Sequence, residues 1–473
     1  MESIKDILAK SNPADIISAL KEKSVTIRPW SDLVKDYDPR LHKIVKDPER
    51  GKKVRGDKVI DPSKITIALE QLLSRRYTQF TFSIPVTRNY LNLTGATDEI
   101  TNKRNEIAKA IEAVYKSARI DAVNSKRGLN YYASCEVCTM WYAVKSKNSL
   151  YGFDSEYKLK CNTYSPMEGV ALYPLFDENE DMVAMSFEYI KKVKDENVSF
   201  FETYTSEGHY QWKNVDNKWE KVEISEINKV QKIPCIYTYR KQPVYEGLTE
   251  IREEIEYTLS RNSDVIAYNS APILKVVGEL KGFESKEDSR RIFRVQNGGD
   301  VSYVSWSQSV ESLKYQIDKL FNLFWMQSQM PDISFDSMVK LGNIGYDARQ
   351  TVLTDSHLRI NDEANVLVES LERECNVIKA FLKAINVKDK LFVQEIDNVT
   401  VEHIITPYRQ NDEKAHIENI MTMNGGKPLI SHKDSIRMGG YTTDAEETYN
   451  TIREEQSQEN DSRMESVFGG GAV

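Results

Sequence analysis

Few residues of this chain have the type and spacing of a catalytic or metal-binding motif. Two of the five cysteines form the pair Cys135-Glu-Val-Cys138, a spacing found in zinc sites and redox-active dithiols. The surrounding residues, 130–145, are rich in aromatic and β-branched types and predict a strand, in which positions three apart point to opposite faces. That geometry suits neither a metal ion nor a redox pair. We therefore interpret the cysteines as buried, reduced thiols.

Nucleotide and acyl-transfer chemistry lack their motifs. The best match to a phosphate-binding loop, Gly425-Gly-Lys-Pro428, places proline where a Mg²⁺-binding hydroxyl is needed, and no predicted strand precedes it. No Gly-x-Ser-x-Gly elbow occurs, and no two of the six histidines have a ligand spacing. Scattered carboxylates could still assemble a metal site on folding, so a metal-dependent nuclease stays open as an alternative. The sequence favours a protein that is not an enzyme and holds no cofactor or metal.

Composition narrows the class further. A chain of 473 residues with 40% hydrophobic content can bury a sizeable core and should contain two or more subdomains. Its 64 basic and 72 acidic residues give a net charge of −8, which argues against a broad basic surface for tight nucleic-acid binding. The most apolar window, 320–326, is too short to span a bilayer, and residues 1–6 do not resemble a signal peptide. We expect a soluble, non-secreted protein with no membrane contact.

The N-terminal third predicts helices and a basic cluster. Residues 1–60 read as polar and irregular, with one short amphipathic helix near 3–21, and longer helical patterns follow at 62–81 and 98–117. Two interpretations fit the cluster in 47–58, a solvated arm or a clamp on an anionic surface. The cluster comprises Arg50, Lys52, Lys53, Arg55 and Lys58.

The hydrophobic period changes from helical to alternating between 131 and 239. Turn-like residues separate the segments, which predicts an antiparallel meander. The predicted strands are 158–165, 182–193, 199–205, 209–215 and 232–239. Its aromatic residues favour a sheet core or a subunit interface over stacking on single-stranded bases, because no arginines are interleaved with them. These aromatics are Phe187, Tyr189, Phe200, Phe201, Tyr204, Tyr210 and Trp212.

The order of elements after residue 234 is the most informative feature. An amphipathic helix over 247–268 has four glutamates in its first half, a crowding typical of a solvated face. A small excursion follows, with strands at 273–277, 291–296 and 301–306, and a second helix over 309–330 returns beside the first. An aperiodic stretch then leads into a third helix over 347–385, about 40 residues long and suited to a structural strut.

This order resembles the phage portal protein family over residues 235–385. In that family a stem helix leads into a clip, a second stem helix returns, a tunnel loop follows, and a long helix crosses the wing. Similar segments lie outside this stretch: 65–92 with Ser83-Ile-Pro-Val86, and 392–409 ending in Ile404-Ile-Thr-Pro-Tyr-Arg409, which resembles a strand. The segment 411–454 looks like the crown helices, with Asn424-Gly-Gly-Lys-Pro-Leu-Ile-Ser431 and Gly439-Gly-Tyr-Thr-Thr-Asp444.

The resemblance implies an α+β ring subunit divided into functional parts. It predicts an N-terminal arm (1–61), wing (62–240), first stem helix (241–270), clip (271–307), second stem helix (308–330), tunnel loop (331–346), long wing helix with return strand (347–409), crown (410–454) and disordered tail (455–473). A different structural ring or adaptor protein would lack the excursion between paired helices, and it is the second alternative to a portal.

The family implies a function and partners. It predicts a homo-oligomer, usually a dodecamer, at a capsid vertex of the virion, assembled in the host cytoplasm. Double-stranded DNA would pass through its channel during packaging and ejection. The terminase large subunit, the head-completion adaptor, and the major capsid and scaffold proteins would bind it. Acidic faces of the stem helices would line a channel that repels phosphate instead of holding it.

Two sets of residues become candidates by this resemblance. In the tunnel loop, the candidates to approach DNA are Met338, Val339, Lys340 and Asn343. In the clip, the candidates to meet the terminase and adaptor are Lys281, Glu284, Lys286, Glu287, Asp288 and Arg290. An ordinary polar connection and a solvated surface are the alternatives for the two sets.

Overall fold

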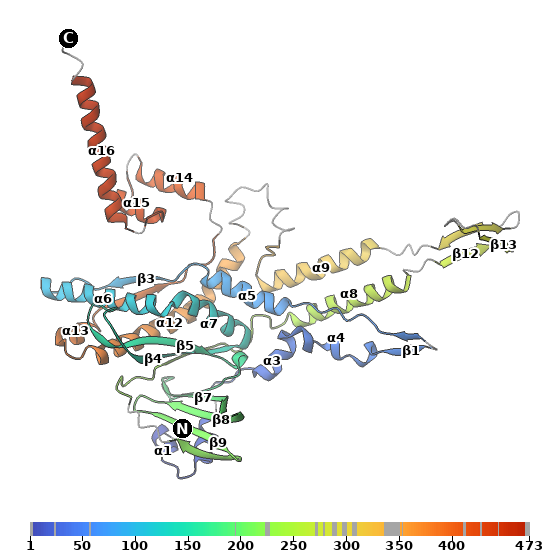
Figure 1. Ribbon diagram of the computed structural model, residues 1–473, viewed down its shortest axis with the longest axis horizontal. Coiled ribbons are helices and arrows are strands. Elements are labelled where there is room, and N and C mark those ends of the chain that lie inside the picture. Colours follow the sequence, from blue (N-terminus) through green and yellow to red (C-terminus); the bar gives the residue numbers. More distant parts are fainter. Residues whose placement is uncertain are drawn as a thin grey trace. The chain divides into compact units, whose positions relative to one another are not determined.

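The chain forms two compact units in a computed structural model (Figure 1). The larger comprises Met1–Val339 and Val352–Tyr408, and the smaller comprises Lys340–Thr351 and Arg409–Val473. The structure describes residues 3–22, 25–55, 58–193, 195–222, 228–269, 273–277, 280–285, 291–295, 300–304, 310–334, 351, 353–409, 413–425, 428–442 and 444–468. Helices and sheets occur together throughout the larger unit, which confirms the α+β class.

The larger unit combines helices with several small antiparallel sheets. Its helices are α1 (Ile4–Leu8), α2 (Pro13–Leu20), α3 (Trp30–Tyr37), α4 (Lys43–Lys46), α5 (Leu69–Phe82), α6 (Asp98–Ala118), α7 (Ile120–Ser134), α8 (Thr249–Asn269), α9 (Val310–Ser328), α12 (Thr354–Ile385) and α13 (Lys390–Glu395). Its strands are β1 (Lys53–Arg55), β2 (Lys58–Ile60), β3 (Thr87–Leu91), β4 (Glu136–Asn148), β5 (Ser155–Tyr164), β6 (Ala171–Phe176), β7 (Met182–Val193), β8 (Glu196–Tyr204), β9 (His209–Val215), β10 (Lys218–Val222), β11 (Cys235–Tyr239), β12 (Ile273–Val277), β13 (Leu280–Ser285), β14 (Arg291–Val295), β15 (Asp300–Val304) and β16 (Thr400–Ile404).

The predicted meander is confirmed as a five-stranded sheet in the order β10-β9-β8-β7-β6. One face packs against α1 and α2 through Phe201 and Trp212, and the other packs against β4 and β11 through Phe187. These three aromatics are buried, as expected for a sheet core. The segments predicted as its first and last strands, β5 and β11, belong instead to a second sheet with the order β11-β4-β5, and β6 and β10 were not predicted.

The first 60 residues are folded. The helix predicted near 3–21 is present as the two helices α1 and α2, but the prediction that the rest of this segment is irregular is wrong, because α3 and α4 follow. Helices α1 and α2 cover the five-stranded sheet, and α3 and α4 lie against α5 and α8. Each helix is short because a proline or an Asn or Asp cap interrupts the chain, as at Pro13 and Pro39. Over four to eight residues the helical period is too brief to stand out in a sequence window.

Residues 130–145 are not one strand. Helix α7 continues to Ser134, and Cys135 reverses the chain with a φ of 66° before β4 begins. The helix crosses α5 so closely that a Cβ atom at Gly128 would lie 2.8 Å from Cδ2 of Phe82. Residues that favour strands therefore end a helix here because the tertiary contact with α5 outweighs local propensity.

Helices α8 and α9 lie side by side and enclose the predicted excursion (Figure 1). Within it β12 pairs with β15 and β13 pairs with β14, both antiparallel. The strand β13 was not predicted. Two-stranded sheets of this size are marginal on their own, which is why the alternating pattern is weak.

Helix α12 has 32 residues and begins at Thr354, later than predicted. Its expected apolar stripe is confirmed, since Leu367, Leu371 and Ile378 are buried. The segment after it is not a single strand: α13 is helical, and only β16 is extended, paired with β3. Asp389 begins α13 by accepting a hydrogen bond from the backbone N–H of Phe392 at 3.0 Å.

The smaller unit contains α14 (Glu413–Asn424), α15 (His432–Gly439) and α16 (Ala445–Phe468). The prediction of a disordered tail from 455 is wrong as far as 468, because α16 continues through it. Backbone N–H groups of Glu446 and Glu447 donate to Asp444 at the start of this helix. Its glutamate and glutamine residues have high helix propensity, and the same composition also characterises disordered segments. Residues 469–473 lie outside the described part of the chain.

Candidate functional site

The candidates taken from the family resemblance lie mostly outside the described residues. These are Met338, Val339, Lys340 and Asn343 of the predicted tunnel loop, and Lys286, Glu287, Asp288 and Arg290 of the predicted clip. Lys281 and Glu284 lie in β13, of which the structure describes the backbone pairing alone. The best-defined polar site in this region is instead the set of contacts that holds α8, the helix that leads into the excursion. We call these contacts, between residues 36–70 and residues 252–264, the support of α8.

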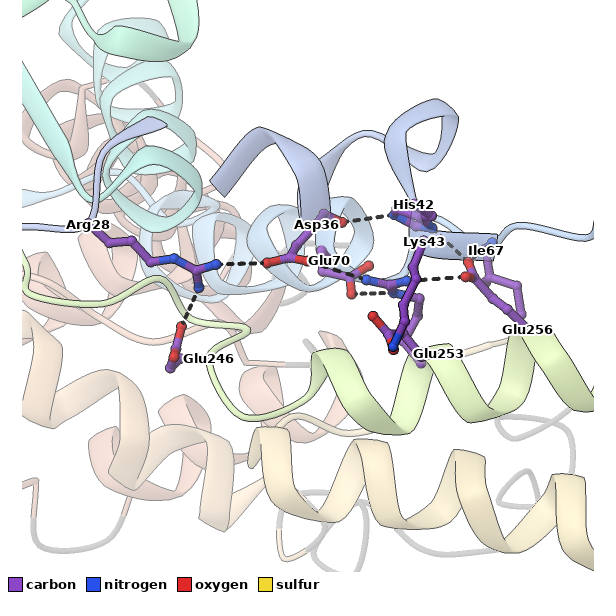
Figure 2. A network of polar contacts seen from close by, with 10 residues as sticks. Arg28, Asp36, His42, Lys43, Ile67, Glu70, Glu246, Glu253 and Glu256 are labelled. Carbon is purple, nitrogen blue, oxygen red and sulfur yellow. Dashed lines mark hydrogen bonds and ion pairs between the residues drawn. The ribbon is translucent and has the colours of Figure 1, made fainter. Parts of the chain in front are cut away.

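The centre of that support is Arg252, whose side chain is 1% exposed. Its Nε donates to Oε1 of Glu70 at 2.8 Å, and its Nη1 donates to Oε2 of Glu256 at 3.1 Å (Figure 2). Both carboxylates are fully buried. Burial raises the pKa of Glu70, against the opposing effect of Arg252. A charged pair in this position is costly to desolvate and depends on each partner keeping its hydrogen bonds.

His42 joins the N-terminal segment to the same carboxylate. Its Nδ1 lies 2.7 Å from Oε1 of Glu256, and its Nε2 lies 2.8 Å from the carbonyl oxygen of Asp36 (Figure 2). The ring is fully buried. Both ring nitrogens therefore face acceptors, one on α8 and one on α3. Through these two contacts the imidazole holds α3 against α8.

An extended segment, residues 63–67, runs along the same side of α8. Backbone N–H groups of Ser63, Ile65 and Ile67 donate to side chains of α8 at 2.7, 2.9 and 2.8 Å. The acceptors, in the same order, are Asp264, Ser260 and Glu256. Two residues of extended chain advance about 6.6 Å, and four residues of helix advance about 6 Å, so alternate amides meet successive turns. This explains why 62–68 is not helical, contrary to the predicted start of that helix.

Two further contacts continue the support toward the end of α8. Arg50 forms an ion pair with Asp264, and the hydroxyl of Tyr257 donates to Asp47 at 2.8 Å. Burial opposes ionisation of Asp264, but hydrogen bonds from Ser63 and Arg50 hold its pKa below the usual value. Arg50 belongs to the basic cluster of the sequence, so at this residue the cluster is neither a solvated arm nor a free clamp.

The acidic face of α8 is only half solvated, which corrects the interpretation from sequence. Glu256 is buried, and Glu253 forms an ion pair with Lys43 at 3.3 Å. Glu250 and Glu254 are exposed. The sequence analysis missed Arg252 and His42. The only local side-chain signal was the i, i+4 spacing of Arg252 and Glu256, because the other side-chain partners are more than 180 residues away.

Helix α9 is anchored differently, through apolar contacts at its C-terminal end. Phe324 is fully buried in the core cluster that includes residues of α5 and α12. The hydroxyl of Tyr77 donates to the carbonyl of Ser328 at 2.9 Å. Tyr315, nearer the start of the helix, is 64% exposed. Polar contacts therefore fix α8 along its length, whereas the core fixes α9 at one end.

A second buried polar centre lies around α12. Glu374 is fully buried and accepts from Nη2 of Arg127 at 3.0 Å and from Nε1 of Trp141 at 2.9 Å. Nearby, Nε2 of His403 lies 3.4 Å from the Tyr115 hydroxyl. Burial, with Arg88, Arg127 and Lys379 adding to it, lowers the pKa of His403 to about 4. These side chains lie in the interior of the larger unit, and their contacts with one another stabilise the fold.

The described residues give no support for metal or thiol chemistry. Within the described ranges, no group of three or more His, Cys, Asp or Glu is placed to hold a metal ion. Burial raises the pKa of the Cys135 thiol to about 12, and the Cys138 thiol contacts Cys235 on the neighbouring strand instead of Cys135. No described helix is long and apolar enough to cross a bilayer.

Comparisons with known proteins bear on the whole chain. Residues 27–462 match the family model described as "Phage portal protein, SPP1 Gp6-like". No curated protein matches in sequence. A solved chain from "Virion of native gene transfer agent (GTA) particle" is similar at 8% identity with a TM-score of 0.38, covering 90% of this chain and 98% of that one. One from "Neck of empty GTA particle computed with C6 symmetry" is similar at 8% identity and 0.36, covering 79% and 89%. At these scores the two structural likenesses carry no argument about function.

Proposed function

Because this chain belongs to the SPP1 Gp6-like family of phage portal proteins, we propose that it forms a homo-oligomeric ring of twelve subunits at one capsid vertex. In this role it is a structural component of the virion, assembled in the host cytoplasm. The channel of the ring conducts double-stranded DNA during packaging and ejection. The arm, wing, stem, clip, tunnel loop and crown take the residue ranges given above.

The observation that best supports this role is the support of α8. A stem helix beside a DNA channel carries the load between the clip and the wing, so it must not shift as DNA passes. In the described part of the chain, α8 is held by side chains at 252, 256, 260 and 264, one on each successive turn or nearly so. Contacts at this spacing resist both sliding and rotation of the helix.

The charge of the channel follows from which carboxylates stay free. Twelve copies at −8 each carry a formal charge of −96. On α8 the exposed carboxylates are Glu250 and Glu254, since Glu253 and Glu256 are paired within the subunit. These two glutamates are the candidates to face DNA from α8. A weakly repulsive wall lets the duplex slide, because phosphate contacts with Lys and Arg would add affinity.

Docking and DNA contact are assigned to the two candidate sets. The clip residues 281–290 bind the terminase large subunit and then the head-completion adaptor, whereas the wing and crown contact capsid and scaffold proteins. In the tunnel loop, Lys340 is the residue whose charge meets DNA. In a packaging assay with the cognate terminase, Lys340→Ala should change the packaging rate, and Lys275→Ala on β12 serves as the matched control. Equal rates for the two variants would contradict this role for Lys340.

The ring is tested by negative-stain electron microscopy of the purified full chain, with the mass measured on the same sample. Rings of about twelve copies, with a hole wide enough for a duplex, are expected. A monomer or dimer that never forms rings, even at high concentration or with scaffold protein, would contradict the proposal. It would favour another adaptor protein, and a screen for metal-dependent nuclease activity would follow.

A further inference from the structure

Strand β11 is the edge of its three-stranded sheet, and no described strand pairs with its outer side. It pairs with β4 alone, in the register that places Tyr237 opposite Cys138. Hydrogen bonds from Trp141 N–H to Pro234 and from Arg240 N–H to Cys135 show which residues bond inward. Because inward and outward groups alternate in an antiparallel ladder, residues 235, 237 and 239 direct their N–H and C=O groups away from β4. No hydrogen-bond partner for these outward groups occurs among the described residues.

The other edges of the two main sheets carry features that discourage pairing. Strand β6 has Pro174 in its middle, and β5 and β10 carry charged residues along their length. Prolines and charges are the usual protection of an exposed edge. Strand β11 has the sequence Cys-Ile-Tyr-Thr-Tyr, with no charge, no proline and high β propensity. An edge of this composition is normally covered by another strand.

A groove runs beside this edge. One cavity of about 780 Å³ lies along residues 235–237, and another of about 580 Å³ lies along residues 237–241. Both are bordered by Tyr237, Glu180 and Arg373, so the two spaces adjoin. Val377 on α12 and Leu8 on α1 give the first cavity apolar walls, and Val366 on α12, 44% exposed, borders the second. Five residues of strand span about 17 Å, the length of an added segment.

Charge around the groove is arranged in a pattern. The turn between β6 and β7 brings Asp177, Glu180 and Asp181 to the groove's middle, where the two cavities adjoin. Lys232 borders the first cavity alone and Lys241 borders the second alone, whereas Glu180 borders both. The remaining charged side chains that line it have partners within the subunit, as in the pair Arg373–Glu369. The middle of the groove therefore favours a positive charge on whatever occupies it.

We propose that the open edge of β11 binds an extended segment of a separate protein, which adds as a fourth strand and carries alternating apolar residues with a central Lys or Arg. The outward backbone groups at 235, 237 and 239 supply main-chain hydrogen bonds, the walls from α12 and α1 take the apolar side chains, and the acidic turn takes the central cation. This surface is distinct from the clip and tunnel loop, and it does not depend on ring formation.

The test uses the full-length protein and a nine-residue peptide, acetyl-Thr-Val-Thr-Val-Lys-Val-Thr-Val-Thr-amide, followed by residue-resolved hydrogen exchange. Exchange of the Tyr237 and Tyr239 amides should slow about tenfold or more on peptide addition, whereas Ile236 and Thr238, already bonded to β4, should change little. A peptide with central Glu in place of Lys should bind more weakly. No protection of 237 and 239 at millimolar peptide would overturn the proposal.

Backbone blocking gives the sharper control. In one peptide the backbone nitrogen of every Val is methylated. In another, the backbone nitrogens of the Thr and Lys residues are methylated instead. One set faces β11 and the other faces solvent, so binding should be lost for one peptide and kept for the other. If both peptides bind, or both fail while the parent binds, strand addition is excluded. Protection of 237 and 239 on ring assembly without peptide would show that a second copy is the occupant, against the proposal.

Two pairs of variants complete the test. Tyr239→Pro removes an outward N–H that β4 does not use, and should weaken peptide binding about tenfold, while Tyr239→Ala keeps the N–H and should bind within about threefold of the parent. Glu180→Lys should weaken binding of the Lys peptide and improve binding of the Glu peptide. The matched control, Glu196→Lys on β8, should do neither. The peptide series on the unchanged protein remains decisive even where a variant folds poorly.

Discussion

The two buried polar centres, one around α8 and one around α12, use the same residue types but differ in their roles. Around α8, Arg252 lies between two buried carboxylates and His42 contacts a third acceptor, so four chain segments meet there. Around α12, Glu374 meets Arg127, but His403 lies among cations and its Nδ1 has no hydrogen-bond partner within the described residues. One histidine is held by acceptors, and the other is surrounded by positive charge.

The difference teaches what each centre does. The α8 centre joins the N-terminal segment to a helix whose other main contacts, among the described residues, are with α9 and with the core at one end. The α12 centre lies inside a core that apolar contacts already define. Losing the first should release a segment, whereas losing the second should weaken the unit as a whole. Each prediction below tests that distinction.

The largest effect is expected from Arg252→Met. It removes the buried cation between Glu70 and Glu256 and leaves two buried carboxylates without it, a change that costs about 3–5 kcal/mol. Chemical denaturation should show the loss, and limited proteolysis should newly cleave residues 28–68. Arg127→Met should lower stability by a similar amount without exposing that segment. Arg261→Met, on the exposed side of α8, is the control and should change stability little.

An equal pattern of proteolysis in Arg252→Met and Arg127→Met would contradict the comparison, because it would mean that both centres serve the same part of the fold. Unchanged stability in Arg252→Met would show that the two carboxylates take up protons or water without cost.

Acidification should affect the α12 centre through His403. Its pKa in the folded protein is about 4, below the value near 6.5 of an unperturbed histidine, so the unfolded state binds the proton more tightly. The contribution of neutral His403 to the free energy of unfolding is fully present above pH 6.5. It decreases as the pH falls to 4, by up to about 3 kcal/mol. His403→Gln should remove this part of the pH dependence, as measured by the difference between the unfolding curves of variant and parent. Parallel curves from pH 7 to 4 would contradict it.

Helices and strands whose hydrophobic period continues over many residues could be predicted from the sequence. The segment 98–117 became α6, and 182–193 became β7 with the same bounds, because each keeps one period over many residues. The α8–excursion–α9 order was also correct. Short helices near prolines, such as α3 and α4, were missed because the window contains too few turns to show a period.

The support of α8 could not be predicted. Its partners come from residues 36–70 and 252–264, and nothing in either segment specifies which polar groups will meet. The extended segment 63–67 even looks helical, because Ile65, Leu69 and Leu72 have the i, i+4, i+7 spacing of one helix face. Its extended conformation is decided by α8, almost 200 residues away, because alternate backbone amides of the segment have the same spacing as successive turns of that helix. Sequence indicated the fold of the helix pair, and tertiary contacts determined the site.

A smaller effect is expected from Ser260→Ala. The hydroxyl accepts from the backbone N–H of Ile65 at 2.9 Å, and Ser260 is fully buried. Removing it leaves an unsatisfied donor between α8 and the extended segment, at about 1–3 kcal/mol. Ser263→Ala should cost less, because the described contact of that hydroxyl is with another hydroxyl, that of Ser63. Equal losses in the two variants would mean that spacing along α8 does not matter. The measurement is thermal unfolding together with hydrogen exchange at Ile65.

The smallest effect, from Lys43→Ala, separates the buried contacts from the exposed ones. Its ammonium pairs with Glu253 at 3.3 Å, but the lysine side chain is 69% exposed. Water and salt screen such a pair, so its loss should change stability by less than about 1 kcal/mol. The change would nevertheless free the Glu253 charge beside Glu250 and Glu254, making that part of α8 more acidic. If Lys43→Ala destabilised the protein as much as Ser260→Ala, the exposed pair would hold the N-terminal segment as firmly as the buried contacts. The contrast between buried support and solvated surface on this helix would then fail.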